Sequence, residues 1–310
     1  GSEMCIRDRD CLAQRGIGLK QKVLILGSTG LIGHQIYNYL KENSAYDLYN
    51  ISYRKKLTSD TIIIDARDEA KLLKKILIIE PDYIINCIGV LIKGSNENHE
   101  NSIFLNAYLP HRISRLADKI SSKLIHISTD CVFSGKKGSS YIETDIKDGE
   151  SFYAKTKALG EVTDRNHLTL RTSVLGPELK NNGEELFQWF INQTDDILGF
   201  TKDIWSGVTS IELAKAVHWS IENNITGLYH ITNNTSISKY GILKIFLKYT
   251  KKNIKINPVD GNNLNKSFVD TRNLINYEIP SYDRMIFEMV ELIVNNKELY
   301  SQYEVISFEK

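Results

Sequence analysis

The stretch Lys22-Val-Leu-Ile-Leu-Gly27-Ser-Thr-Gly30-Leu-Ile-Gly33 decides the fold of this chain. A short apolar segment leads into three glycines spaced three residues apart, and a segment with helical apolar spacing follows. A buried strand, a glycine-rich turn and a helix in this order hold the phosphates of a dinucleotide in parallel α/β sheets. Gly27 would permit the tight turn, Gly30 would admit a phosphate, and Gly33 would let the helix pack on the strand.

Short apolar segments alternate with helical ones after this motif, which is typical of a parallel sheet covered by helices on both faces. Expected strands are 23–26, 47–53, 61–64, 83–88, 123–128 and 168–172, and expected helices are 31–42, 69–79, 101–120 and 152–163. Pro110 is expected to bend or break the third of these helices. We predict a doubly wound, Rossmann-like α/β domain over residues 21–176. Residues 177–310 are expected to complete the sheet and to form a small C-terminal substrate-binding lobe.

Composition and charge exclude several classes of protein. The chain has 310 residues and a formal net charge of +1, so it can bury a large core and its bulk charge favours neither nucleic acid nor a membrane as partner. No apolar run approaches the roughly 20 residues of a membrane span. The four cysteines and seven histidines show no metal-ligand spacing and no dense disulfide framework. We therefore expect a reduced, cytoplasmic protein without a metal site.

Residues 1–20 do not match the rest of the chain. They begin Gly-Ser and carry alternating charges without apolar periodicity. They also lack the apolar core of a secretion signal. We expect a leader that is non-native or disordered and has no part in function.

The end of the second expected strand bears on which dinucleotide is bound. An acidic residue there would bind the ribose 2′-hydroxyl of NAD, whereas basic residues accommodate the 2′-phosphate of NADP. The sequence reads Tyr49-Asn-Ile-Ser-Tyr-Arg54-Lys-Lys56 and has no carboxylate at the strand end. Arg54 is a suitable phosphate partner, which favours NADP (NADPH) and leaves NAD as the alternative. Asp65, at the end of the third expected strand, would either accept a hydrogen bond from the adenine amino group or simply cap that strand.

Three further residues are candidates for catalysis. Tyr153 and Lys157 lie four positions apart, one helical turn, and Thr129 lies at the end of an expected strand about one element upstream. Hydride transfer to a ketone leaves an alkoxide that needs a proton, and a phenol with a pKa of about 10 is sluggish near neutrality unless a cation favours its ionised form. Lys157 would supply that cation and could hold the nicotinamide ribose. Thr129 would polarise the substrate carbonyl.

Taken together, these motifs resemble those of the extended short-chain dehydrogenase/reductases. The motifs are the glycine loop, Asn86-Cys-Ile-Gly89, Asn106, Ser128-Thr-Asp-Cys-Val-Phe133, Tyr153-x-x-x-Lys157 and Arg171-Thr-Ser173. Within that family the chain is similar to the dTDP-4-dehydrorhamnose reductase group, which reduces 4-keto-6-deoxy nucleotide sugars. The resemblance is dense from Lys22 to Gly176 and looser to about Pro280.

The resemblance implies a Thr129/Tyr153/Lys157 triad, an NADPH-type coenzyme and a nucleotide-sugar pocket between two lobes. It also implies that Asn106 supports the active site and that Ser173 lies near the nicotinamide. The full set of coenzyme contacts expected is Gly27, Thr29, Gly30, Leu31, Ile32, Gly33, Arg54, Asp65, Ala66, Cys87, Ile88, Gly89, Asn106, Ser128, Tyr153, Lys157 and Ser173.

These expectations lead to a predicted function with two alternatives. We predict an NADPH-dependent reductase of a 4-keto-6-deoxy nucleotide sugar, acting in deoxysugar synthesis for a surface polysaccharide. A related dehydratase is disfavoured because Asp130 is followed by Cys131, and a thiol with a pKa of about 8.5 is a poor base in place of glutamate. An NAD-dependent epimerase and a non-catalytic binding subunit on the same fold remain as alternatives. The nucleotide, the sugar and the oligomeric state stay open, with a homodimer as one expectation.

Overall fold

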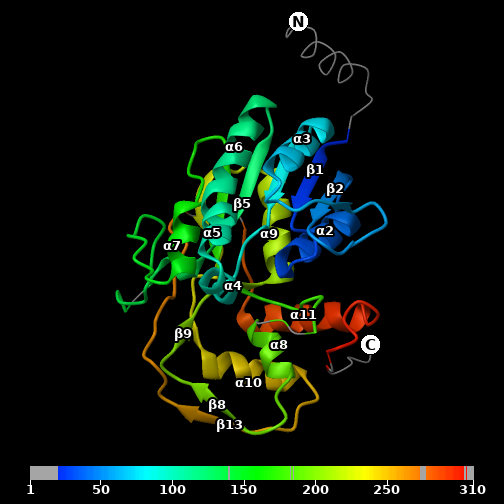
Figure 1. The fold of residues 1–310 in the computed structure, drawn as a ribbon. Coiled ribbons are helices and arrows are strands. Elements are labelled where there is room, and N and C mark those ends of the chain that lie inside the picture. Colours follow the sequence, from blue (N-terminus) through cyan, green and yellow to red (C-terminus); the bar gives the residue numbers. More distant parts are fainter. Residues whose placement is uncertain are drawn as a thin grey trace, which may run out of the picture.

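A parallel sheet forms the centre of the molecule. The computed structural model describes residues 20–138, 140–181, 183, 185–272, 277–303 and 305, so all but the last residue of the predicted leader lies outside the described residues. Seven strands are arranged in the order β11-β6-β5-β4-β1-β2-β3 (Figure 1). They are β1 (Lys22–Leu26), β2 (Asp47–Ser52), β3 (Ile62–Ile63), β4 (Tyr83–Asn86), β5 (Lys123–Thr129), β6 (Leu168–Thr172) and β11 (Gly227–His230). All adjacent strands run parallel, which confirms the predicted fold class.

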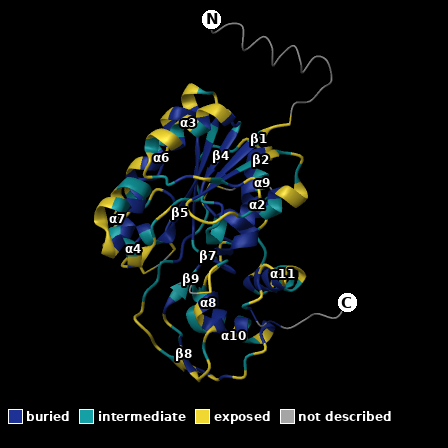
Figure 2. Ribbon diagram, turned by 45° about the vertical axis from the view of Figure 1, so that its right-hand side comes forward, coloured by how far each residue is buried: buried dark blue, intermediate teal, exposed yellow. Residues whose placement is uncertain are grey.

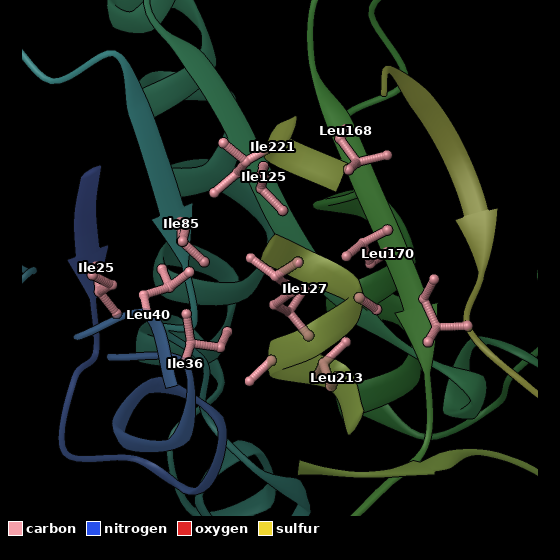
Figure 3. Packing of buried hydrophobic residues seen from close by; sticks show 14 of the residues in the cluster. Ile25, Ile36, Leu40, Ile85, Ile125, Ile127, Leu168, Leu170, Leu213 and Ile221 are labelled. Carbon is pink, nitrogen blue, oxygen red and sulfur yellow. The ribbon is translucent and has the colours of Figure 1, made fainter. Parts of the chain in front are cut away.

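Helices cover both faces of this sheet because its central strands are apolar on both sides. Leu24, Ile84 and Leu124 pack on one face, against α3 (Glu69–Ile79) and α6 (Leu109–Lys119). The residue that follows each of them in sequence packs on the other face, since side chains alternate along a strand. There the cover is α2 (Leu31–Asn43) and α9 (Ser210–Glu222), and Figure 3 shows their apolar side chains meeting those of the strands. Figure 2 shows the same layering, with a buried sheet and helices exposed on their outer sides.

The strand order reverses between β1 and β4, and this places the candidate site. Both strands end at the same edge, where Leu26 of β1 is paired with Asn86 of β4. The chain leaves them in opposite lateral directions, toward β2 on one side and toward β5 on the other. Ligands of open α/β sheets bind in the crevice at such a switch point.

The segment predicted as one helix over 101–120 is broken into several turns. It begins earlier, with α4 (Ile92–Glu97) and α5 (His99–Ser102), passes through a π-helical turn at Ile103–Tyr108 and continues as α6. Pro110 marks a break, as predicted, because it occupies the first turn of α6 directly after the π-helical turn, where a missing N–H costs nothing. The π-helical turn contains Asn106, whose side chain bonds to a neighbouring loop.

A second, smaller lobe lies below the sheet in Figure 1. We define it by α8 (Leu186–Ile191), β8 (Ile197–Phe200), α10 (Lys239–Tyr249), β13 (Ile256–Val259) and α11 (Tyr282–Asn295). These elements enclose an apolar cluster that includes Phe187, Phe246 and Met289. Short strands β7 (Val174–Leu175), β9 (Ile204–Trp205), β10 (Val208–Thr209) and β12 (Ile237–Ser238) also form in this half of the chain. None of the helices in the described part of the chain has the length and apolarity to cross a membrane.

Candidate active site

The glycine turn lies at the switch point with its backbone tightly packed. Gly27 adopts a positive φ of 80°, and its N–H donates to the carbonyl oxygen of Ile51 at 2.9 Å. A Cβ on Gly33 would lie 2.3 Å from the Gly27 carbonyl oxygen, so α2 can approach the turn this closely only with glycine there. Gly30 is the N-cap of α2 and provides no side-chain cap. The first turn of α2 therefore presents backbone N–H groups suited to a phosphate.

Thr129, Tyr153 and Lys157 come together from two elements. Thr129 ends β5, and the other two lie on α7 (Phe152–Leu159), whose first turn is capped by Ser151. All three side chains are buried. The Thr129 hydroxyl lies within hydrogen-bonding reach of the Tyr153 phenol, and Lys157 Nζ donates to the carbonyl oxygen of Ile127 at 2.8 Å. The structure thus brings the three predicted catalytic residues into one buried cluster.

The protonation of this cluster differs from the expectation drawn from the sequence. Burial raises the pKa of Tyr153 above its ordinary value. Burial also lowers the pKa of Lys157 to about 8, opposed by the charge of Glu161. The phenol is therefore protonated at neutral pH, because desolvation outweighs the expected help from the ammonium group. A protonated phenol is the form that can give a proton to an alkoxide.

Asn106 ties the loop after β4 to the helix that carries the phenol. Its Oδ1 accepts from the N–H of Val90 at 2.8 Å, and its Nδ2 donates to the carbonyl oxygen of Val90 at 3.0 Å. The same amide lies 3.3 Å from the hydroxyl of Thr156 on α7. A Cβ on Gly160 would lie 1.8 Å from the carbonyl oxygen of Asn106, so α7 ends directly against the π-helical turn. The support of the active site by Asn106, which the resemblance implies, stays a prediction.

The other predicted coenzyme contacts line the same sheet edge. Thr29, Leu31 and Ile32 lie in the glycine turn and the first turn of α2, Ala66 follows β3, and Cys87, Ile88 and Gly89 follow β4. A Cβ on Gly27 would lie 3.1 Å from the carbonyl carbon of Cys87, which shows how closely the two strand ends approach. Burial raises the pKa of the Cys87 thiol to about 12, so that thiol is neutral.

Two arginines meet at the end of β2. The guanidinium of Arg54 lies 4.3 Å from the centre of the Tyr53 ring, and Nη2 of Arg67 donates to the Tyr53 hydroxyl at 2.8 Å. Arg67 also donates through Nε to both carboxylate oxygens of Asp65, at 3.0 and 2.9 Å. The Asp65 carboxylate is therefore engaged by Arg67, and a contact between Asp65 and the adenine amino group stays a prediction. Arg67 was not predicted as a site residue from the sequence, although the spacing Asp65-Ala-Arg67 allows the arginine to fold back on the carboxylate.

Ser128 and Ser173 are committed to protein partners. The Ser128 hydroxyl donates to Oε1 of Glu161 at 2.7 Å, and the Ser173 hydroxyl accepts from the indole N–H of Trp205 at 2.8 Å. Ser173 also approaches the buried carboxyl of Asp130, whose pKa burial raises. No sequence pattern predicts the contacts of Glu161, because its partners Ser128 and Arg171 lie on separate strands.

Lys266 was also missed. It lies between β13 and α11, and its positive charge opposes the rise in the Asp130 pKa. A residue of the C-terminal half thus brings a cation to the end of β5. Among the described residues, no group of three or more histidine, cysteine or carboxylate side chains is placed to hold a metal ion.

This is a Rossmann-like protein of the extended short-chain dehydrogenase/reductase fold. The order of the strands, the glycine turn and the buried cluster of Thr129, Tyr153 and Lys157 define this class. The chain belongs to the family described as the RmlD substrate binding domain, whose model matches residues 21–270. This membership confirms the resemblance predicted from the motifs.

Characterised relatives share about a quarter of their residues with this chain. Spore coat polysaccharide biosynthesis protein SpsK of Bacillus subtilis is 25% identical over 71% of this chain and 76% of its own length. dTDP-4-dehydrorhamnose reductase of Aggregatibacter actinomycetemcomitans is 27% identical over 71% of this chain and 76% of its own length. Methionine adenosyltransferase 2 subunit beta of Xenopus laevis is 27% identical over 72% of this chain and 70% of its own length.

Solved structures show the same fold. The dTDP-4-dehydrorhamnose reductase of Bacillus anthracis, crystallised in complex with NADP, superposes with a TM-score of 0.74. The two chains are 21% identical, and the match covers 88% of this chain and all of the other. At this identity the likeness concerns the fold alone.

Proposed function

We propose that this protein is an oxidoreductase that uses NADPH to reduce the 4-keto group of a 6-deoxy nucleotide sugar. One observation carries the proposal: Thr129, Tyr153 and Lys157 form a buried cluster at the edge of the sheet where the glycine turn lies. The relatives named as dTDP-4-dehydrorhamnose reductases support the substrate class.

The residues of the cluster suit the proton side of such a reduction. When bound, the coenzyme would supply a hydride to the carbonyl carbon. The Thr129 hydroxyl donates a hydrogen bond to the carbonyl oxygen, and Tyr153 transfers its phenolic proton to that oxygen as the C–O bond becomes an alcohol. Lys157 holds the ribose hydroxyls through its ammonium group. Because burial keeps the phenol protonated, the proton is available at neutral pH.

The arginine pair supports NADPH as the coenzyme. Arg54 and Arg67 contact the same phenol at the end of β2, next to the strand that leads into the glycine turn. Guanidinium groups bind phosphate in a bidentate manner, so this pair suits a ribose 2′-phosphate. The Asp65 carboxylate would hold the guanidinium of Arg67 in place, without contacting the coenzyme itself.

Surface polysaccharide synthesis is the setting that we propose for this reaction. SpsK, a relative at 25% identity, is named for spore coat polysaccharide biosynthesis. The free thiols of Cys87 and Cys131 suit a reducing compartment, and we place the reaction in the cytoplasm.

The test is an NADPH-oxidation screen over a panel of 4-keto-6-deoxy nucleotide sugars carrying dTDP, UDP or GDP, with NADH in parallel. We expect turnover with at least one sugar. Tyr153→Phe should lower kcat by roughly 10²- to 10⁴-fold, because the phenol supplies general-acid catalysis. The dissociation constant of the Tyr153→Phe variant for NADPH, measured by fluorescence, should stay close to that of the unmodified protein. Equal turnover by the two proteins would refute the role of Tyr153.

A second candidate is a non-catalytic binding subunit on the same fold. It is favoured by the relatives named methionine adenosyltransferase 2 subunit beta, one of which is 27% identical to this chain. The same screen separates the candidates. A subunit of this kind would bind NADPH without oxidising it with any sugar of the panel.

A further inference from the structure

A buried carboxylate connects the catalytic strand with the catalytic helix. Glu161 lies four residues after Lys157 and is only 5% exposed. Its Oε1 accepts from the Ser128 hydroxyl at 2.7 Å and from Nε of Arg171 at 2.8 Å. Its Oε2 accepts from Nη2 of Arg171 at 2.7 Å and lies 3.1 Å from Nζ of Lys147. Because Ser128 directly precedes Thr129, one carboxylate holds both halves of the proposed catalytic cluster.

Among the groups of this network, Glu161 is the anion that acts on Lys157. Arg171 also contacts Nε2 of His230 at 2.8 Å, but burial lowers the pKa of His230 to about 4, so that ring brings no charge. Glu143 is a second buried anion near His230, and Thr271 binds its carboxylate through both N–H and hydroxyl. The negative charge of Glu143 therefore lies beside His230, whereas Glu161 is the carboxylate that the Arg171 side chain binds.

The groups that face Lys157 from the neighbouring strands are neutral. Cys87, after β4, has its thiol pKa raised to about 12 by burial, and His126, on β5, has its pKa lowered well below its ordinary value. The Ile127 carbonyl accepts from Lys157 Nζ. Tyr153, on the same helix, is protonated. Lys157 Nζ and the Glu161 carboxylate bond to adjacent residues of β5, Ile127 and Ser128, so the two charged groups lie at the same end of that strand. The negative charge of Glu161 there favours the ammonium form of Lys157.

We propose that Glu161, oriented by Ser128 and Arg171, is a positioning residue that keeps Lys157 charged in its dry surroundings. This inference rests on the proposed function, in which the ammonium group of Lys157 holds the coenzyme. Without Glu161, the cations Arg171 and Lys147 would face Lys157 uncompensated. Lys157 would then lose its proton at a lower pH, and turnover would fall at that same lower pH.

The protonation of Lys157 can be measured without any sugar. In protein labelled with [¹³C]lysine, the ¹³Cε resonance of Lys157, assigned through Lys157→Met, reports its titration directly. Glu161→Gln keeps the size of the side chain and removes its charge. We expect the Lys157 titration to move down by about one pH unit or more, because the loss of a nearby opposite charge disfavours the charged form. The alkaline limb of the kcat profile should move by the same amount.

Lys147→Met is the matched variant with the opposite sign. It removes a cation beside Glu161, and its side chain is 35% exposed, so folding should tolerate the change. We expect the Lys157 titration to move upward, by less than in Glu161→Gln. A role that is only structural would not move the two titrations in opposite directions. Ser128→Ala, which deletes one hydrogen bond to Glu161 and no charge, should give a smaller downward shift.

The outcomes separate the inference from the proposed function. Unchanged titrations in Glu161→Gln and Lys147→Met, or shifts of the same sign, would overturn the inference. If Glu161→Gln does not fold, Lys147→Met decides the question by itself. A downward shift of its Lys157 titration, or no shift, would overturn the inference. Opposite shifts in the titration of Lys157, in a protein that oxidises NADPH with no sugar, would support the inference and refute the reductase.

Discussion

At the scale of single residues, we expect the end of β2 to decide which coenzyme this protein accepts. Arg67 reaches the Tyr53 hydroxyl and is held by Asp65, and Arg54 lies against the same ring. Arg67→Ala removes one of two cations from the proposed 2′-phosphate site. We expect the dissociation constant for NADPH to rise roughly tenfold or more, because a hydrogen bond to a charged group contributes about 1.5–3 kcal/mol.

NADH has no 2′-phosphate, so its affinity for Arg67→Ala should be unchanged. Lys56→Ala is the matched control, since Lys56 Nζ donates to the carbonyl oxygen of Ser59 and is exposed. Fluorescence titrations with both coenzymes check this prediction. An equal loss of affinity for NADPH and NADH in Arg67→Ala would show that Arg67 supports the fold of this loop and does not read the phosphate.

At the scale of elements, the contact between α7 and the π-helical turn positions the phenol. Gly160 follows α7, and a Cβ there would meet the carbonyl oxygen of Asn106. Gly160→Ala must push the two segments apart, because backbone atoms cannot swing aside. We expect a loss of about 1–3 kcal/mol in the free energy of unfolding, as for overpacked sites, together with a lower kcat.

Leu159→Ala is the control for this contact, because Leu159 is the neighbouring residue and is 70% exposed. Its unfolding free energy should change by no more than about 0.5 kcal/mol. Urea denaturation and steady-state kinetics report the two effects. Full stability and full kcat in Gly160→Ala would show that α7 and the π-helical turn do not depend on this close approach.

At the scale of the whole molecule, the C-terminal segment joins the two lobes. The Tyr300 hydroxyl lies 2.9 Å from Nε2 of His34 on α2 and accepts from the Gln35 amide at 2.6 Å. Three residues later, the Tyr303 hydroxyl accepts from the N–H of Glu178 at 2.7 Å and contacts Gln188 on α8. The segment after α11 thus fastens the helix of the glycine turn to the small lobe.

This junction makes stability depend on pH through His34. Burial lowers the pKa of His34 from 6.5 to about 4, so between these values the unfolded chain binds a proton that the folded chain does not. The stability that neutral His34 contributes is therefore complete above pH 6.5 and is lost as the pH falls toward 4. The effect is on the order of 3 kcal/mol, at 1.36 kcal/mol for each pKa unit.

Glu185 has the opposite effect on the pH dependence of stability, because burial raises its pKa to about 8. The difference between the unmodified protein and His34→Gln isolates His34, because Glu185 contributes equally to both. Unfolding free energies from urea denaturation at pH 7, 5.5 and 4.5 provide the measurement. We expect the loss of stability on acidification to be smaller in His34→Gln. Parallel curves for the two proteins would contradict a neutral, buried His34.

The sequence by itself determined the parts of this protein that depend on local chemistry. A strand, three spaced glycines and a helix specify a phosphate-binding turn through backbone conformation alone, and apolar runs specify buried parallel strands. Tyr153 and Lys157 share a helix face because of their four-residue spacing. For these reasons the fold class was predicted correctly, as were the bounds of α3 and β6.

Only the tertiary structure decided where charges lie and which proton each group holds. The Lys157 ammonium faces Ile127, Asp65 is taken by Arg67, and the Tyr153 phenol is kept protonated by burial. The Glu161 carboxylate is placed by partners on β5 and β6, and Asn106 in the π-helical turn bonds to the loop after β4. The physical reason is that desolvation and ion pairing depend on neighbours that are far apart in sequence and meet only when the sheet is assembled.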